Sequence, residues 1–177
     1  ITATRITATD NDDNGLEFDA ASVTLSNATV SDHTLTGISI TSTSATLRNV
    51  ESNNNGVNDF SDNYQGINID TAEDVDLTDI SAQGNYDTNV RISGDPLSRT
   101  ISITNISVRN SEQRSGLGIT GSTEGNEITI TNATATGNDD DGIYLSAASA
   151  DITDATVSDN SEDGIEFRAL SGAASVS

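Results

Sequence analysis

The chain has 177 residues, of which 33% are apolar and 3% aromatic, and its formal net charge at pH 7 is −21. Low apolar content with high net charge is typical of disordered chains, so only a regular apolar pattern can establish a folded core. The negative charge excludes nucleic acid as a partner, and the absence of cysteine excludes disulfides and cysteine-ligated metals. No apolar run approaches the roughly 18 residues of a membrane-spanning helix.

The charged residues are strongly biased in type. All seven basic residues are arginine, whereas 28 residues are acidic. A dense carboxylate surface retains water and cations in molar salt, where its self-repulsion is screened within roughly 3 Å. The composition therefore resembles that of proteins from extreme halophiles, especially haloarchaea. The alternative is an acidic extracellular repeat protein that binds calcium.

One repeated signature is a glycine followed by apolar residues at alternate positions. It begins at residues 15, 37, 66, 116, 142 and 164, and a variant with asparagine in the glycine position begins at residue 89. Successive copies are separated by 22 to 29 residues. Alternation with period two predicts a short strand with one buried face after each anchor residue.

A second signature lies between these anchors and predicts two more strands per repeat. It reads apolar, any, apolar, any, Asn or Asp, apolar, any, small, over residues 23–30, 45–52, 75–82, 101–108, 128–135 and 150–157. Residues 1–8 also fit, with Arg5 in the asparagine position. Asparagine tolerates the left-handed conformation of a tight bend, and stacked copies can hydrogen-bond as a ladder. The predicted structural Asn/Asp ladder is Asn27, Asn49, Asp79, Asn105, Asn132 and Asp154.

A further asparagine column is predicted after the third strand of each repeat. Its members are Asn11, Asn53, Asn85, Asn110, Asn138 and Asn160, with His33 taking the place of asparagine once.

Repeats of this length, with three strands and an asparagine ladder, resemble the parallel β-helix repeat of the pectin-lyase-like superfamily. The resemblance covers nearly the whole chain. It implies an all-β, right-handed, single-stranded parallel β-helix of about seven rungs, with three short strands each and no helices. It does not imply one function, because lyases, hydrolases, epimerases, phage tailspikes and adhesins share this fold.

The two ends of the sequence lack recognisable caps. The chain begins in the middle of a rung at Ile1, and residues 173–177 repeat the pattern of residues 20–24, which start a new rung. An open terminal rung exposes a strand edge. We therefore expect residues 1–177 to form one β-helix segment of a longer chain, with self-association by rung stacking or as a trimer.

Acidic clusters precede several of the repeated glycines and are candidate calcium sites. Oxygen ligands at alternate positions before a glycine suit calcium. Residues 10–15 resemble the first half of an EF-hand loop, but the twelfth position is Ala21, which excludes a complete EF-hand. The alternative is a solvated acidic surface. The candidate ligands are Asp10, Asp12, Asn14, Asp139, Asp141, Asp159 and Asp163.

Two rungs are enlarged by longer loops, over residues 51–65 and 93–100. Loops on a rigid scaffold often carry binding sites. Phe60 and Tyr64 lie beside asparagines in the first loop and are candidate carbohydrate contacts. Simple variation in loop length is the alternative explanation.

The sequence offers no catalytic constellation, so we assign no catalytic residue and favour a protein that is not an enzyme. Lyases of the resembled superfamily use a basic residue beside calcium-bound carboxylates, and this chain has no lysine. The only histidine, His33, falls in the asparagine column, where it is interpreted as a structural turn residue. Neighbours among Asp139, Asp140 and Asp141 are expected to point apart, as in a strand.

These observations predict a non-catalytic structural or adhesive rod of an extracellular surface protein, filament or virus spike in a high-salt environment. The alternatives are a fragment of a carbohydrate-active β-helical enzyme and a calcium-dependent polysaccharide-binding module. No cofactor is required, although calcium binding is compatible with the acidic turns. The expected location is extracellular or at the cell surface. The expected partner is a polysaccharide, a cell surface or another copy of the chain.

Overall fold

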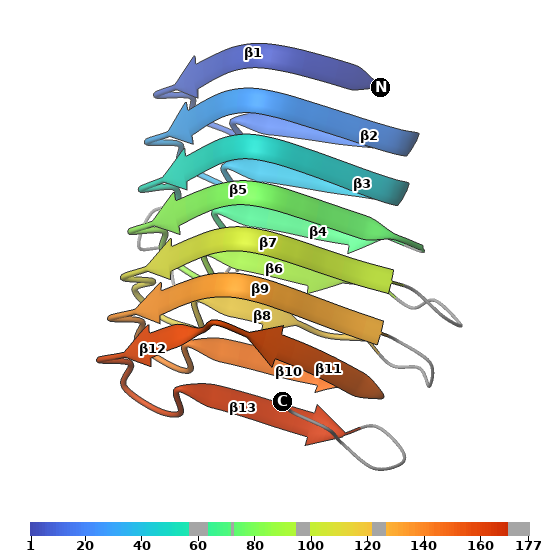
Figure 1. Ribbon diagram of the computed structural model, residues 1–177. Coiled ribbons are helices and arrows are strands. Elements are labelled where there is room, and N and C mark those ends of the chain that lie inside the picture. The colour runs from blue at the N-terminus through green and yellow to red at the C-terminus, as the bar shows by residue number, and fades with distance from the viewer. Residues whose placement is uncertain (57–63, 72, 95–99, 122–126, 170–177) are drawn as a thin grey trace.

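The chain folds into a parallel β-helix. The computed structural model describes residues 1–56, 64–71, 73–94, 100–121 and 127–169. These ranges contain thirteen strands, every strand pair in them is parallel, and they contain no helix. Figure 1 shows the strands stacked in order from β1 at the N-terminal end to β13. The solenoid has about six turns, which confirms the predicted fold class and is close to the predicted seven rungs.

The strands form two ladders that run the length of the solenoid. The glycine-strand ladder contains the first parts of β2 (Leu16–Ser31) and β3 (Ile38–Asn53), followed by β4 (Ile67–Thr71), β6 (Val90–Ser93), β8 (Leu117–Ile119), β10 (Ile143–Ala147) and β13 (Ile165–Ala169). The bent-strand ladder contains β1 (Thr2–Thr9), the second parts of β2 and β3, β5 (Val75–Gln83), β7 (Thr100–Arg109), β9 (Glu127–Thr136), and finally β11 (Ser149–Thr153) and β12 (Thr156–Ser158). Pairing is one to one, so equivalent positions of successive rungs stack.

The second and third strands expected in each rung form one strand with a bend. In β5, β7 and β9 the bend falls on Asp79, Asn105 and Asn132, which have φ between 56° and 57°. On the exposed side of this bend, Asn49 donates to Asn27 at 2.9 Å, and Asn105 donates to Asp79 at 2.8 Å. Each amide therefore donates to the rung before it. The Asp79 side chain has no N–H group with which to continue the ladder toward Asn49.

A second, buried column follows the third strand, and two of its members differ from the prediction. The column contains His33, Asn55, Asn85, Ser111, Asn138 and Asn160. Asn53 was predicted in place of Asn55, and Asn110 in place of Ser111. Both predictions are wrong because, on each rung, a residue with a left-handed backbone conformation comes directly before the column position. On these two rungs that residue is Asn54 (φ 53°) and Asn110 (φ 52°), so the column position falls on Asn55 and Ser111.

The core is a narrow tube filled by stacked aliphatic side chains. One column pairs Leu25, Leu47, Leu77, Ile103 and Ile130 in register, and each of these side chains is fully buried. Burial of one Leu or Ile side chain stabilises a fold by roughly 1.5–3 kcal/mol. A low apolar content is sufficient here because most of the described apolar residues point into one continuous core.

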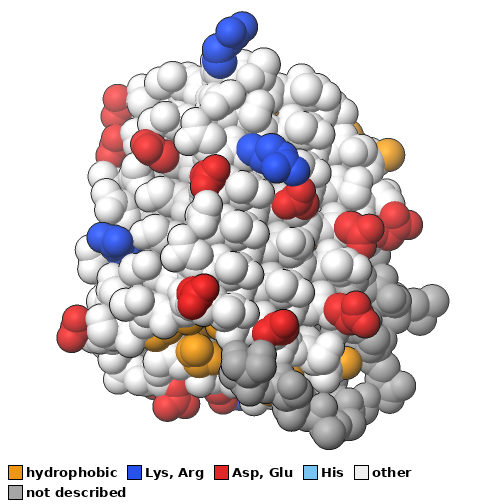
Figure 2. Space-filling model, viewed as in Figure 1, with side chains coloured by type: hydrophobic (Ala, Val, Ile, Leu, Met, Phe, Trp, Pro, Cys, Tyr) orange, Lys and Arg blue, Asp and Glu red, His pale blue; other side chains and the backbone are white. Residues whose placement is uncertain are grey.

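The surface is acidic and sparsely ion-paired. Figure 2 shows carboxylates scattered over the face formed by the bent-strand ladder, with few basic side chains between them. Within the described residues, ion pairs join Arg48 to Asp76, Arg114 to Asp87, and Arg168 to Glu166. No helix in the described part of the chain is able to cross a membrane.

Candidate functional site

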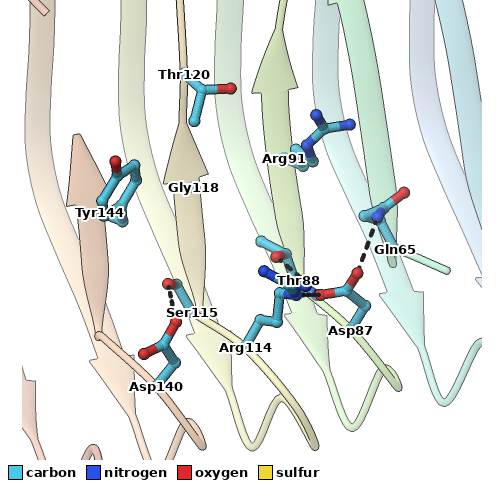
Figure 3. Close-up of a pocket in the computed structure, with 10 residues that line it drawn as sticks. All are labelled: Gln65, Asp87, Thr88, Arg91, Arg114, Ser115, Gly118, Thr120, Asp140 and Tyr144. Carbon is cyan, nitrogen blue, oxygen red and sulfur yellow. Dashed lines mark hydrogen bonds and ion pairs between the residues drawn. The ribbon is translucent and has the colours of Figure 1, made fainter. Parts of the chain in front are cut away.

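A groove with a volume of about 330 Å³ lies on the outer surface of the glycine-strand ladder, over β6, β8 and β10. Arg91, Gly118 and Tyr144 are paired in register on these three strands. Their side-chain positions therefore form one column across the groove (Figure 3). At about 4.8 Å per rung, the backbones at Arg91 and Tyr144 are about 9.6 Å apart.

The hollow exists because Gly118 has no side chain between two long ones. Gly118 needs no unusual backbone conformation, and an added Cβ would meet only Thr88 Cγ2, at 3.4 Å. At Gly116, two residues earlier, an added Cβ would lie 2.6 Å from Asn138 Nδ2 and 2.8 Å from Val108 Cγ2. Packing therefore excludes a side chain at Gly116 but not at Gly118. Glycine also weakens a strand interior, and it often marks a place where a ligand approaches the backbone closely.

A buried carboxylate forms one wall of the groove. The Asp87 residue is 3% exposed, and its carboxylate accepts hydrogen bonds from Gln65 Nε2 at 3.2 Å and from the Thr88 backbone N–H at 2.7 Å. Arg114 Nε lies 3.3 Å from Asp87 Oδ1. Asp87 is therefore neutralised and fixed, which is the usual condition for burying a charge.

The remaining charges of the groove are separated along it. Arg91 is half-buried, and its guanidinium donates to Asn68 Oδ1 at 3.4 Å, but no described carboxylate forms an ion pair with it. At the other end, the Arg168 guanidinium carbon lies 5.2 Å from the centroid of the Tyr144 ring. Arg168 also pairs with Glu166 at 2.8 Å. Among the described residues, the positive charge at the Arg91 end of the groove therefore has no ion-pair partner.

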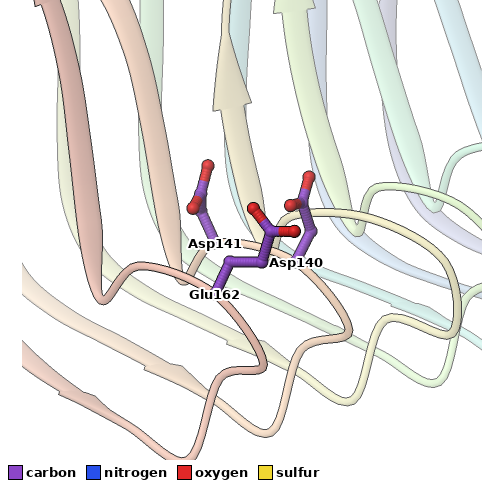
Figure 4. Close-up of side chains that lie close together, drawn as sticks. All are labelled: Asp140, Asp141 and Glu162. Carbon is purple, nitrogen blue, oxygen red and sulfur yellow. The ribbon is translucent and has the colours of Figure 1, made fainter.

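Three carboxylates gather in the turns that precede β10 and β13 (Figure 4). Asp140, Asp141 and Glu162 each place an oxygen within 4.8 Å of the others. Asp141 is 3% exposed and accepts the Asp163 backbone N–H at 3.1 Å, while Asp140 accepts the Ser115 hydroxyl at 3.3 Å. Burial is the largest cause that raises the pKa of Asp141 from 3.8 to about 6. Nearby carboxylates including Asp140 contribute to the rise, and the backbone hydrogen bond from Asp163 opposes it.

This acidic cluster contains one of the predicted calcium ligands, Asp141. Asp139 and Asp159 are exposed outside it, and Asp163 contributes its backbone N–H. The predicted ligands of the first turn, Asp10, Asp12 and Asn14, belong to no comparable group within the described residues. Calcium binding therefore stays a prediction.

Of the two predicted carbohydrate contacts, only Tyr64 is described, and it is not among the described residues that line the groove. Phe60 lies outside the described residues. Tyr64 is half-buried, and its carbonyl accepts the Asp87 backbone N–H at 3.1 Å. Carbohydrate contact by these two residues stays a prediction.

Residues that the sequence analysis did not select make up most of the site. Asp140 and Asp141 were expected to point apart as strand neighbours, but they lie in a turn before β10, where strand alternation does not apply. Arg91, Gly118 and Tyr144 each stand two residues after an anchor of the glycine repeat. An alignment of the anchors would have placed these three residues in one outward column.

Comparison with known families agrees with this architecture. Residues 43–173 match the family model described as periplasmic copper-binding protein (NosD). The chain belongs to the NosD family. The fold of this family is a right-handed β-helix of the pectin-lyase-like type, as predicted. Its periplasmic location is consistent with the extracellular or cell-surface location that we expected. No curated protein and no solved structure matches the chain.

The copper in the NosD family description does not fit the residues of this chain. Copper sites in proteins are built mainly from histidine, cysteine and methionine. The chain has no cysteine or methionine, and its single histidine, His33, is 2% exposed. One ring nitrogen of His33 accepts the Asn11 backbone N–H at 3.1 Å, and the other bonds the Ala8 carbonyl at 3.1 Å. No imidazole lone pair is left to bind copper.

We expect the replacement Asp141→Asn to stabilise the protein at neutral pH. The folded-state pKa of about 6 lies above the ordinary 3.8, so the folded protein binds more protons than the unfolded chain between pH 4 and 6. Stability contributed by protonated Asp141 is therefore present below about pH 4 and is lost as the pH rises through 6. The shift corresponds to a gain of about 1–3 kcal/mol for Asp141→Asn at pH 7.

Urea unfolding of both proteins at pH 4, 5, 6 and 7 measures this difference. The exposed neighbour supplies a matched control, because Asp139→Asn removes the same charge type without removing a buried group. A stability difference between Asp141→Asn and wild type that is the same at pH 4 and pH 7 would contradict the assignment.

Proposed function

We propose that this chain is a non-catalytic structural rod of an extracytoplasmic protein, and that it carries a ligand-binding groove on its surface. The observation that supports the rod most directly is the unbroken one-to-one register from β1 to β13. In such solenoids each rung contacts only its neighbours, so the number of rungs sets the length. The groove then has a fixed position on a stiff support.

The side chains support a non-catalytic role. His33 uses both ring nitrogens in backbone contacts, so it has no free nitrogen for proton transfer. The buried carboxylate of the groove, Asp87, is held by Arg114, Gln65 and Thr88. These groups are arranged to hold a shape and a charge pattern.

A high-salt environment is part of this proposal. Ion pairs between described residues engage three acidic side chains, those of Asp76, Asp87 and Glu166, whereas the net charge of the whole chain is −21. Self-repulsion of such a surface falls when ions screen it. The acidic surface would therefore favour folding in concentrated salt.

Deletion of one complete rung tests the rod. Removing residues 16–37 joins Gly15 to Ile38, and because Leu16 pairs with Ile38 and Thr24 with Thr46, β1 can pair directly with β3. We expect a cooperatively folded protein with unchanged circular dichroism per residue, shorter by about 4.8 Å. As a control, removing β2 alone (residues 16–31) leaves an unmatched turn and is expected to prevent folding of the first rungs.

Two outcomes would contradict the proposal. Unfolding of the protein that lacks residues 16–37 would show that the rungs are not interchangeable units. Release of products from uronate polymers by the intact chain, detected by mass spectrometry, would favour the carbohydrate-active enzyme instead.

A further inference from the structure

We propose that the groove binds a small zwitterion of dipeptide size, with its carboxylate at Arg91 and its ammonium group between Tyr144 and the acidic cluster. This inference rests on the proposed function, because it names the ligand class of the groove that the rod carries. It is argued from the charges at the two ends of the groove, the space between them and the residue that creates that space.

The Arg91 end suits a carboxylate. Its guanidinium is half-buried and has one long hydrogen bond, to Asn68 Oδ1 at 3.4 Å, and no ion pair within the described part of the chain. A guanidinium presents a planar fork of N–H donors that matches a carboxylate in two parallel hydrogen bonds. An anionic ligand would supply the partner that the protein does not.

The Tyr144 end suits a cation. Asp140 and Tyr144 both line the groove, and Asp141 and Glu162 lie within the same cluster of carboxylate oxygens. An ammonium group can donate three hydrogen bonds and is attracted to the face of an aromatic ring. The Tyr144 ring already lies near one cation, the Arg168 guanidinium. Tyr144 is on β10, which lies between β8 with Gly118 and β13 with Arg168. Arg168 and the floor of the groove are therefore on opposite sides of the Tyr144 strand.

The middle of the groove is open, and the two charged residues that line it there, Arg114 and Asp87, are paired with each other. Gly118 forms its floor, and the hydroxyl-bearing residues Thr88, Ser115 and Thr120 line its sides. A side chain at position 118 would fill this space, although packing would tolerate a small one. The ligand therefore needs two charged ends joined by a short, mostly neutral segment.

The dimensions of the groove are compatible with a ligand of dipeptide size. The two ends of the groove stand on rungs about 9.6 Å apart. An extended residue spans about 3.5 Å, so the termini of a dipeptide are about 7 Å apart, which leaves about 2.6 Å in total for contact with the two ends of the groove. The volume of about 330 Å³ is at the lower end of the range for small-molecule sites.

Calorimetric titration of the intact chain with alanylalanine tests this inference, at a salt concentration at which circular dichroism shows that the chain is folded. We expect a dissociation constant of about 1 mM, with binding weakened at least tenfold by N-acetylation and also by C-terminal amidation. Arg91→Gln should remove the difference between the free and amidated carboxyl ends. Glu162→Gln should reduce the difference between the free and acetylated amino ends.

Two variants separate loss of the groove from loss of the fold. Gly118→Leu fills the groove and should abolish binding while circular dichroism and the unfolding midpoint stay near those of wild type. Ser39→Leu changes the same outward column on β3, away from the groove, and should leave binding unchanged.

Equal binding of the blocked dipeptides, or no heat with alanylalanine at about 10 mM, would overturn the inference. Binding of a neutral disaccharide without binding of alanylalanine would overturn it in favour of a carbohydrate site. None of these results affects the rung-deletion experiment, so the rod and the ligand class can fail separately.

Discussion

Replacing Gly66 with alanine should destabilise the protein by about 3 kcal/mol, whereas the same replacement at Gly118 should change its stability by less than about 1 kcal/mol. An added Cβ at Gly66 would lie 2.6 Å from the Asn89 carbonyl oxygen and 2.7 Å from Asn85 Cγ. Neither neighbour can move freely. The Asn89 carbonyl accepts the Ile67 N–H at 2.9 Å, and the Asn85 amide is held inside the buried asparagine column.

Gly118 is the matched control because a Gly→Ala change reduces the freedom of the unfolded chain similarly at both sites. Neither glycine has a left-handed φ, so the comparison isolates packing in the folded state. Urea unfolding of the two variants and wild type gives the free energies of unfolding. If Gly66→Ala lowers the free energy of unfolding by an amount within 1 kcal/mol of the change caused by Gly118→Ala, the rungs can separate to admit a methyl group.

The glycine anchors show how much of the fold the repeat pattern alone predicts. Their spacing predicted the strands, and the structure gives the physical reason for the glycine. At Gly37, Gly66 and Gly142 an added Cβ would lie 2.6 Å from a carbonyl oxygen of the next rung. The structure also explains why asparagine replaces glycine at the anchor position 89. The side chain of Ser111 has no amide group to donate along the buried column. The side-chain amide of Asn89 takes this place and donates to the Arg109 carbonyl and to Asn138 Oδ1.

The groove was harder to predict because it depends on residues from different rungs. Arg91, Gly118 and Tyr144 are separated in sequence by 27 and 26 residues, and only exact register places them side by side. The periodic pattern does predict that register. It does not predict the path of the turns, which brings Asp140, Asp141 and Glu162 together. Turn geometry depends on local backbone angles that hydrophobic periodicity does not encode.

Family membership and side-chain chemistry give different information about this chain. The match to the NosD family covers residues 43–173 and agrees with the fold. The groove residues supply guanidinium, phenol, hydroxyl and carboxylate groups, which suit hydrogen-bonding ligands and hard cations better than copper. A β-helix can keep its core and ladders while its outward positions change freely, so the fold persists when the ligand differs.

Replacing Asn85 with alanine should cost about 3–5 kcal/mol, among the largest effects expected of any single change in this chain. Asn85 is fully buried, and its amide donates to the Ser52 carbonyl at 3.0 Å and to Asn89 Oδ1 at 2.7 Å. Its Oδ1 accepts from the Asn55 backbone N–H at 3.0 Å and from Asn55 Nδ2 at 2.9 Å. Truncation therefore removes four buried hydrogen bonds and leaves the Asn55 backbone N–H without its side-chain partner.

The exposed ladder provides the control for this prediction. Asn105 donates to Asp79 at 2.8 Å, but water can replace that bond, and Asn105→Gly keeps the left-handed backbone accessible. We expect Asn105→Gly to cost less than about 1 kcal/mol in the same urea unfolding experiment. If both variants lose similar stability, burial is not what strengthens the inner column. If only Asn85→Ala unfolds readily, the inner column holds the rungs in register, while the outer one mainly accommodates the bend.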